Sequence, residues 1–276
     1  MVIDTLAAFG LTISRSLENF GRFTCFGAVT MGWAIRGVGG FGRIGLLLPQ
    51  LFQIGTRSIP VVVVVGVFVG AVLGVEAYDQ FRAIGQEGRL GSLIHISVVK
   101  QIGPVLAAVM IAGRVGGAVS AELGTMRVTE QLDALRVMGA APISYLVVPR
   151  VMACLIMLPI LTILSDLMGI FGGWLVVVQG FGVDSGDYWM FSKRFVTGWD
   201  VCTGLIKSVV FGGAIGLISC YKGFHCQSGA AGVGRATTDA FVTSFLAIIV
   251  VNFFLANFLK EMYELIWGTA GPTAFG

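Results

Sequence analysis

Five long apolar runs, separated by short polar segments, constrain this chain more than any other feature of its sequence. Each is close to the ~20 residues that an α-helix needs to cross ~30 Å of hydrocarbon, although the first is short and the third is long. Inside a bilayer only helices and closed barrels satisfy every backbone polar group. We therefore expect an all-α membrane protein with five spans, at approximately Ile59–Val75, Leu93–Ala112, Val151–Val178, Val201–Cys220 and Ala240–Leu259.

The composition agrees with a membrane protein. Only 12% of the 276 residues are charged, against ~25% in a typical soluble domain, and mean hydropathy is +0.89. The 40 glycines suit closely packed membrane helices. The sequence has no basic tract, so we expect no nucleic-acid partner.

Motifs for cofactors and metals are missing from the sequence. No phosphate loop of the form GxxxxGK[ST] occurs, so any ATP that powers this protein is expected to bind another subunit. The five cysteines show no CxxC spacing, and Cys220 and Cys226 flank a single histidine, His225. This is too few ligands for a zinc site, so we expect no metal.

The N-terminal segment differs from the five runs. Residues 1–25 predict an amphipathic helix, because apolar residues recur at helical spacing opposite Arg15, Glu18, Asn19 and Arg22. It has no apolar run of spanning length, so we expect it to lie in the membrane interface. The N-terminus has no charged segment followed by a compact apolar region, so we expect no cleavable signal peptide. We divide the chain into residues 1–48, the interfacial helix and a linker, and residues 49–276, the five-span domain.

The distribution of Lys and Arg predicts the orientation. With the N-terminus in the cytoplasm, five basic residues lie outside, namely Arg82, Arg89, Lys193, Arg194 and Lys260. Eleven lie inside, namely Arg15, Arg22, Arg36, Arg43, Arg57, Arg114, Arg127, Arg136, Arg150, Lys222 and Arg235. Eleven against five favours a cytoplasmic N-terminus and, with five spans, an external C-terminus.

Small residues recur at every fourth position in three spans. These stripes let helix backbones approach closely. Packing within one bundle accounts for all of them, and the alternative is that one stripe forms a seam between two copies of the chain. The stripes are Gly66, Gly70 and Gly74; Ala108, Ala112, Gly116, Ser120 and Gly124; and Gly204, Ser208, Gly212 and Gly216.

Four polar residues lie inside the apolar runs: Lys100, Gln101, Asp166 and Lys207. A charge at mid-bilayer costs at least ~2.5–3.5 kcal/mol, so each charged group should face a cavity or a partner. Lys207 lies about one third into its span from the outer end, where snorkelling to the interface is an equal alternative. Two cations in the outer half could bind an anionic head group. Asp166 could pair with one of them or occupy a packing seam with Ser165.

The segment Ala121–Pro142, AELGTMRVTEQLDALRVMGAAP, lies between the second and third spans on the predicted inner side. A helix from about Thr129 would carry an apolar stripe of Val128, Leu132, Leu135 and Met138. An amphipathic helix resting on lipid is one interpretation. However, such helices are usually basic, whereas this one also carries carboxylates, which favours docking on a soluble partner.

At these residues the chain resembles the MlaE/YrbE-type permease family, the membrane subunits of lipid-transporting ABC systems that work with MCE-domain proteins. The resemblance runs from about Pro49 to Leu259, and the string AELGTMRVTEQLDAL is its most specific part. Supporting strings are Gly66–Tyr78 (GVFVGAVLGVEAY), Gly103-Pro104-Val105, Ala112–Gly117 (AGRVGG), Leu205–Val210 (LIKSVV) and Gly232–Thr238 (GVGRATT).

The resemblance implies a homodimeric permease of the bacterial inner membrane that moves phospholipid or a related lipid to or from an extracytoplasmic MCE protein. A separate subunit would bind ATP and Mg²⁺, and the segment Glu122–Leu135 would be the helix that couples to it. The implied coupling residues are Glu122, Gly124, Met126, Thr129, Glu130, Gln131 and Leu135. The implied lipid-binding residues are Val72, Leu73, Tyr78, Lys100, Gln101, Pro104 and Lys207.

One position departs from the family's pattern. Some relatives carry a carboxylate where this chain has Gln101, which puts in doubt a role for an acid at that position.

The alternative function is a secondary transporter or channel driven by an ion gradient through Lys100, Asp166 and Lys207. Such proteins usually show inverted repeats and paired broken helices, and the sequence shows no clear repeat.

Overall fold

The computed structural model describes residues 2–37 and 44–267, and every regular element in these two ranges is helical. Five helical segments are long and apolar enough to cross a membrane: Gly45–Ala83, Glu87–Val128, Ile143–Gly180, Gly198–Phe224 and Ala230–Ile266. Each contains one of the five predicted apolar runs. The predicted all-α membrane fold with five spans is confirmed.

The first three spans are built from several consecutive helical pieces, some of them π-helical or 3-10 turns. The first span comprises α2 (Ile44–Ile54), η2 (Thr56–Ser58) and α3 (Ile59–Ala83). The second comprises η3 (Glu87–Arg89), α4 (Leu90–Ser97), η4 (Val98–Ile102), α5 (Gly103–Ile111), η5 (Ala112–Gly116) and α6 (Gly117–Val128). The third comprises η6 (Ile143–Val147), α8 (Val148–Trp174) and η7 (Leu175–Gly180). The last two are α10 (Gly198–Phe224) and α11 (Ala230–Trp267).

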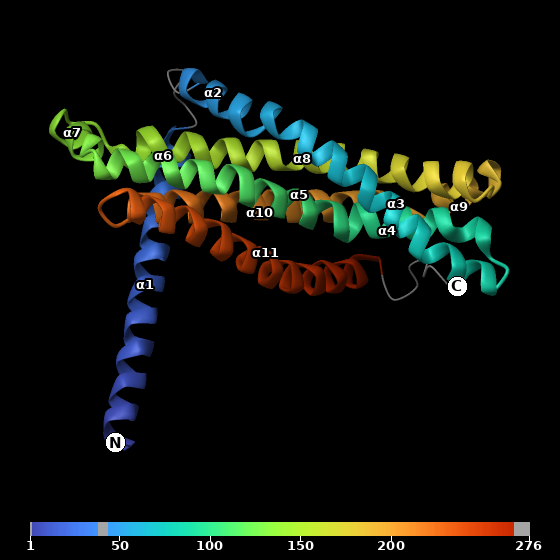
Figure 1. Cartoon of the computed structure of the whole chain (residues 1–276), viewed down its shortest axis with the longest axis horizontal. Helices are drawn as coiled ribbons and strands as arrows, with labels where there is room; N and C mark the ends of the chain where they lie inside the picture. The colour runs from blue at the N-terminus through green and yellow to red at the C-terminus, as the bar shows by residue number, and fades with distance from the viewer. Residues whose placement is uncertain (1, 38–43, 268–276) are drawn as a thin grey trace.

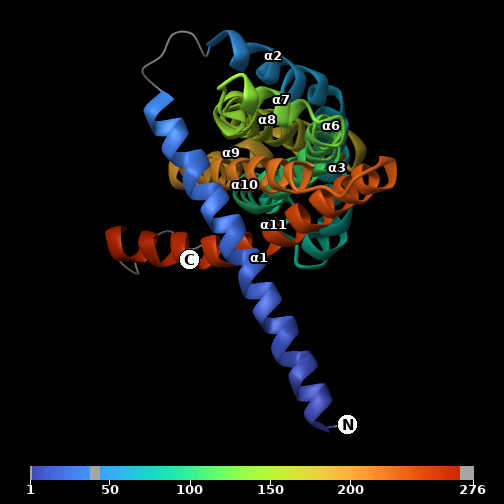
Figure 2. The same cartoon turned by 90° about the vertical axis from the view of Figure 1, so that its left-hand side faces the viewer.

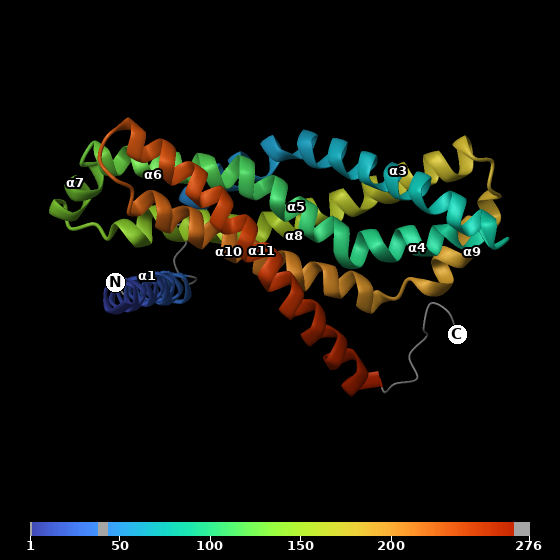
Figure 3. The ribbon, with the colours of Figure 1, turned by 60° about the horizontal axis from the view of Figure 1, so that its bottom comes forward.

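The spans form an elongated bundle in which α8 packs against α3, α10, α5 and α2 (Figure 1). Two short helices mark the opposite ends of this bundle, α7 (Gln131–Val137) and α9 (Ser185–Phe195). Near its C-terminus α11 turns away from the other spans (Figure 3). We call the two ends of the bundle the α7 end and the α9 end.

The predicted glycine stripes lie inside the bundle. A Cβ atom on Gly70 would collide with the backbone carbonyl of Gly169 in α8, and one on Gly172 would collide with Val67 in α3. Gly204 and Gly212 of α10 likewise pack on backbone atoms of η4 and α8. Of the two interpretations of the stripes, packing within one chain is the one that the structure shows at these positions.

The N-terminal helix α1 (Val2–Gly37) is longer than the predicted 1–25 and runs across the direction of the spans (Figures 1 and 2). Phe26 anchors it at the α7 end, because its ring packs against Tyr221, Phe224 and His225. A helix that runs across membrane spans can lie along a membrane surface. Its place in the interface stays a prediction.

Candidate functional site

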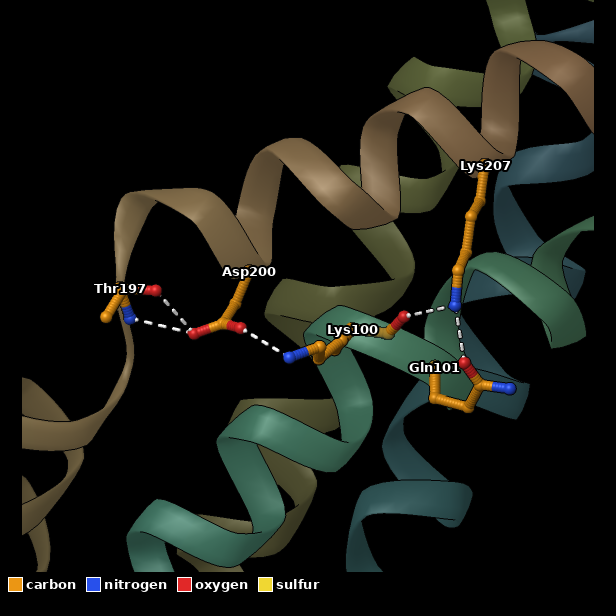
Figure 4. A network of polar contacts seen from close by, with 5 residues as sticks. All are labelled: Lys100, Gln101, Thr197, Asp200 and Lys207. Carbon is orange, nitrogen blue, oxygen red and sulfur yellow. Dashed lines mark hydrogen bonds and ion pairs between the residues drawn. The ribbon is translucent and has the colours of Figure 1, made fainter. Parts of the chain in front are cut away.

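A polar network lies in the outer half of the predicted topology, where α10 begins beside η4 (Figure 4). It starts from the first turn of α10, which a capping box closes between Thr197 and Asp200. One Asp200 carboxylate oxygen accepts hydrogen bonds from the Thr197 hydroxyl at 2.7 Å and from its backbone N–H at 3.0 Å. The capping box fixes the Asp200 side chain and leaves its second oxygen free for another partner.

Lys100 is that partner. Its Nζ lies 3.1 Å from the free carboxylate oxygen of Asp200. The Asp200 side chain is buried, whereas almost half of the Lys100 side chain is exposed. The ion pair joins the second span to the fourth.

Lys207 follows Asp200 by two helical turns on α10, and its side chain is only 1% exposed. Its Nζ donates to the backbone carbonyl oxygen of Lys100 at 3.1 Å and to the side-chain oxygen of Gln101 at 2.5 Å (Figure 4). Proline lacks the N–H that would normally bond the carbonyl four residues earlier, so Pro104 leaves the Lys100 carbonyl available. Lys207 is therefore held inside the bundle and does not snorkel.

A cavity of about 340 Å³ borders this network. Lys100, Gln101, Asp200 and Lys207 supply its polar wall. The remaining lining residues are largely apolar or aromatic and come from α4, the end of α9, the start of α10 and the second half of α11, among them Ile96, Phe195, Trp199, Ala256, Leu259 and Tyr263. Lys260 of α11 adds a further basic group to the lining. The cavity thus combines cationic and apolar walls, as binding sites for amphiphiles do.

The other predicted lipid-binding residues lie elsewhere. Val72 is 61% exposed on α3, where it and Leu73 line a separate apolar depression of about 340 Å³ with Val64, Val65, Phe68 and Val69. Tyr78 is buried and stacks on Phe181 with ring centroids 4.0 Å apart. Pro104 is buried beside Gly204. Within one chain the structure therefore brings Lys100, Gln101 and Lys207 together, with Pro104 on the next helical turn, whereas Val72, Leu73 and Tyr78 lie apart from them.

Asp166 does not pair with either lysine. It is buried in α8, its side chain lies against Gly103, and its Oδ1 has no hydrogen-bond partner in the described part of the chain. Of the two interpretations in the sequence analysis, the packing seam is the one that the structure shows. The carboxylate that pairs with a lysine of the network is Asp200.

The predicted coupling segment forms two helices rather than one. The α6 helix ends at Val128 and α7 begins at Gln131, two residues later than the expected start at Thr129. Between them Glu130 adopts a left-handed backbone conformation with φ of 59°. Glu130 is therefore the residue that precedes α7, and the left-handed turn at this position separates α7 from α6.

Only some of the residues in the predicted apolar stripe and coupling set are exposed. Leu132 is completely buried, whereas Val137 is 88% exposed and Met138 is 72% exposed. Asp133 forms ion pairs with Arg127 at 3.6 Å and with Arg136 at 2.8 Å. Of the remaining predicted coupling residues, Thr129, Glu130 and Gln131 are exposed, whereas Leu135 is half-buried.

Three predicted coupling residues face the bundle. Glu122 accepts a hydrogen bond from Gln53 of α2 at 2.8 Å and pairs with the buried Arg150 of α8 at 2.9 Å. Gly124 packs against Cys226 and Val233, and Met126 packs on the main hydrophobic core. Through these contacts a movement of α6 would be transmitted to the first, third and fifth spans.

Sequence reasoning missed Thr197, Asp200 and Arg150 as members of these networks. For the first two a signal exists, because Thr-Gly-Trp-Asp at residues 197–200 is a capping-box pattern before an apolar run. Arg150 carries no such local signal. Its partner lies 28 residues away, and only the packing of α6 on α8 brings the two together.

These features define a polytopic membrane protein with a charged, amphiphile-sized cavity toward one end and a solvent-exposed helical turn at the other. The sequence matches the family Permease MlaE over residues 47–258. The chain belongs to this family of membrane permeases.

Proteins of similar sequence occur in several bacteria. A probable ABC transporter permease protein of Rickettsia bellii is 38% identical over 93% of this chain and 98% of its own length. Another from Synechocystis is 43% identical over 83% of this chain and 84% of its own. The intermembrane phospholipid transport system permease protein MlaE of Haemophilus influenzae is 34% identical over 92% and 97%.

Proposed function

We propose that this chain is the permease subunit of an ABC transporter that moves phospholipid, or a related lipid, between a bacterial inner membrane and an extracytoplasmic MCE protein. Membership of the permease family supports the transport role, and the name of the Haemophilus influenzae relative supports phospholipid as the cargo. The cavity beside Lys207 is the single structural observation that carries the proposal.

That cavity suits the polar end of a lipid. Lys100 is neutralised by Asp200, whereas the acceptors of Lys207 are a carbonyl and an amide, which are both uncharged. The network therefore keeps a net positive charge beside apolar walls. A phosphate group can bind there while the acyl chains leave along the exposed apolar surfaces of the spans.

The apolar depression on α3 supplies a second part of the lipid path when two copies of the chain associate. Val64, Phe68 and Val72 recur along one exposed face of α3. Apolar faces of this kind on two protomers form a chamber between them, which the twofold symmetry of a homodimer makes continuous. The implied lipid site thus has a cationic part inside each protomer and an apolar part between the protomers.

The energy source belongs to another subunit, which binds ATP and Mg²⁺. The α6–α7 turn is the docking surface for it, and the exposed residues Glu130, Gln131, Val137 and Met138 form the contact. The Lys/Arg distribution supports a cytoplasmic location for this end and for the N-terminus. The internal contacts of Glu122 then carry the docking movement to α2 and α8.

Reconstitution tests the lipid site. The full chain is assembled with its ATPase and MCE partners in proteoliposomes, and ATP-dependent transfer of a labelled phospholipid is measured. Lys207→Met keeps the length of the side chain and removes its charge, so transfer of an anionic lipid should fall more than transfer of a zwitterionic one.

Lys193→Met, on the exposed surface of α9, is the matched control, because it removes the same charge outside the cavity. Equal transfer of both lipids by the Lys207 variant and the wild-type chain would remove the cavity from the lipid path. Transfer that follows an ion gradient and not ATP would favour the secondary-transporter alternative.

A further inference from the structure

A second polar pocket lies on the other side of the bundle, toward the α7 end. It has a volume of about 110 Å³ and lies between the first span, at α2 and η2, and the second span, at η5 and α6. Arg57 and Arg114 line it together with Gln50 and Gln53. No carboxylate lines this pocket, so it carries two positive charges. It shares no residue with the cavity beside Lys207.

The two arginines are not occupied by acidic partners. Both side chains are exposed, and neither forms an ion pair within residues 17–36 and 45–266, whose side chains the structure describes. One residue that lines the pocket, Gln53, donates a hydrogen bond to the carboxylate of Glu122 at 2.8 Å. Arg150 already neutralises Glu122 at 2.9 Å. Two positive charges therefore remain for an external anion.

The pocket lies where the predicted apolar runs of the first two spans begin and end. Arg57 comes two residues before the apolar helix α3, and Arg114 comes two residues after Ala112, where the apolar run of the second span ends. The two spans are antiparallel, so both arginines reach the same boundary. The polar contacts of Glu122 lie farther toward the α7 end. Toward the α9 end, Val61 and Val64 are exposed on α3. A bound molecule would thus meet charge at one end and apolar surface at the other.

We propose that this pocket binds the phosphate diester of an anionic phospholipid from the leaflet on the α7 side. Arginine matches the geometry of phosphate oxygens through paired N–H donors. Basic pockets between membrane helices on the cytoplasmic side are typical sites for anionic head groups. The volume corresponds to only a few water molecules at ~30 Å³ each. The pocket therefore holds the phosphate, and the acyl chains remain in the bilayer beside Val61 and Val64.

This site does not depend on the proposed transport function. An anionic lipid fixed between α2 and α6 would tie together the two helices that Gln53 and Glu122 already join. It would therefore hold the α6–α7 turn relative to the first span, whichever cargo the permease moves. Substitution of Arg57 and Arg114 leaves the cavity beside Lys207 intact. Loss of lipid binding at the arginine pocket and loss of transport can therefore be observed separately.

Native mass spectrometry of the full chain in mild detergent tests the site by titration with phosphatidylglycerol and, separately, with phosphatidylcholine. The wild-type chain should retain phosphatidylglycerol preferentially. Arg57→Gln with Arg114→Gln should weaken that binding roughly thirtyfold, the loss expected for two basic residues at an anionic head group. Arg57→Lys with Arg114→Lys should keep only part of it, because lysine retains the charge but lacks the paired N–H donors of arginine.

Lys193→Gln with Arg194→Gln on α9 is the charge-matched control at the opposite end, and it should bind phosphatidylglycerol as the wild-type chain does. Unchanged phosphatidylglycerol binding by the Arg57 and Arg114 glutamine variant would overturn the proposal. An equal loss in the α9 control would also overturn it, because net charge alone would then explain the binding. Displacement of the lipid by inorganic phosphate would assign the pocket to a soluble anion and would overturn the lipid assignment.

Discussion

The contact between α3 and α8 depends on glycine at position 70, and Gly70→Ala measures that dependence. A Cβ at this position meets the carbonyl oxygen, carbonyl carbon and Cα of Gly169. All three are backbone atoms, so no side-chain rotation relieves the collision. The two helices must separate, and a neighbouring contact, between Gly172 and the backbone of Val67, separates with them.

Overpacking of a close contact usually costs ~1–3 kcal/mol. The cost at Gly70 should lie in the upper half of that range, since a gap of ~0.5–1 Å already forfeits a quarter to a half of each atom-pair attraction along the seam. Alanine adds up to ~1 kcal/mol of helix propensity, which offsets part of the loss. A net destabilisation of about 2 kcal/mol corresponds to a roughly thirtyfold larger unfolded fraction.

Unfolding of the purified chain by sodium dodecyl sulfate in mixed micelles, followed by tryptophan fluorescence, measures this difference. Gly117→Ala in α6 is the control, because no heavy atom lies within 4 Å of its Cβ position. It should be neutral or slightly stabilising. Gly172→Ala should resemble Gly70→Ala, and the double variant should cost less than the sum, because the same two helices are already separated. Identical unfolding of the Gly70 and Gly117 variants would refute the packing argument.

Three further predictions concern the two ends of the bundle. In a background without other accessible cysteines, an impermeant maleimide added to intact cells should label Lys193→Cys but not Ser228→Cys, and the reverse pattern would overturn the predicted orientation. Val137→Asp should lower co-purification of the ATPase subunit without affecting folding, because the side chain is 88% exposed; unchanged co-purification would remove α7 from the interface. Burial raises the pKa of the Cys226 thiol, so its alkylation should be slow at neutral pH and accelerate as pH rises; a rate already maximal at neutral pH would contradict this.

The spans could be predicted from the sequence because lipid leaves the backbone few alternatives. A run such as Ile59–Val75 must form a helix wherever it crosses hydrocarbon, and the structure places each predicted run within one span. The ends of the spans were less predictable. The first helical span begins at Gly45 rather than at Ile59, because the amphipathic α2 continues the line of α3 without a long apolar run of its own.

The partners of the charged residues could not be predicted in the same way. Lys100, Asp166, Asp200 and Lys207 all lie on helices that the sequence identifies, yet their pairing depends on how each helix is rotated about its axis. Asp166 and Asp200 are both carboxylates near the lysines in the predicted topology. Only the packing of α8 on Gly103 separates the first from them, and only the capping box at Thr197 directs the second toward Lys100.

The irregular turn η4 explains why the cationic site occurs where it does. A regular helix has no free carbonyl with which to hold a buried ammonium group, because each carbonyl already accepts an intrahelical hydrogen bond. Pro104 removes one such donor, and the π-helical turn Val98–Ile102 carries the Lys100 carbonyl and the Gln101 amide to the side where Lys207 approaches. The same irregularity that weakens the second span as a helix therefore supplies the neutral acceptors that keep a positive charge inside the bundle. A carboxylate in place of Gln101 would cancel that charge and with it the proposed preference for an anionic lipid.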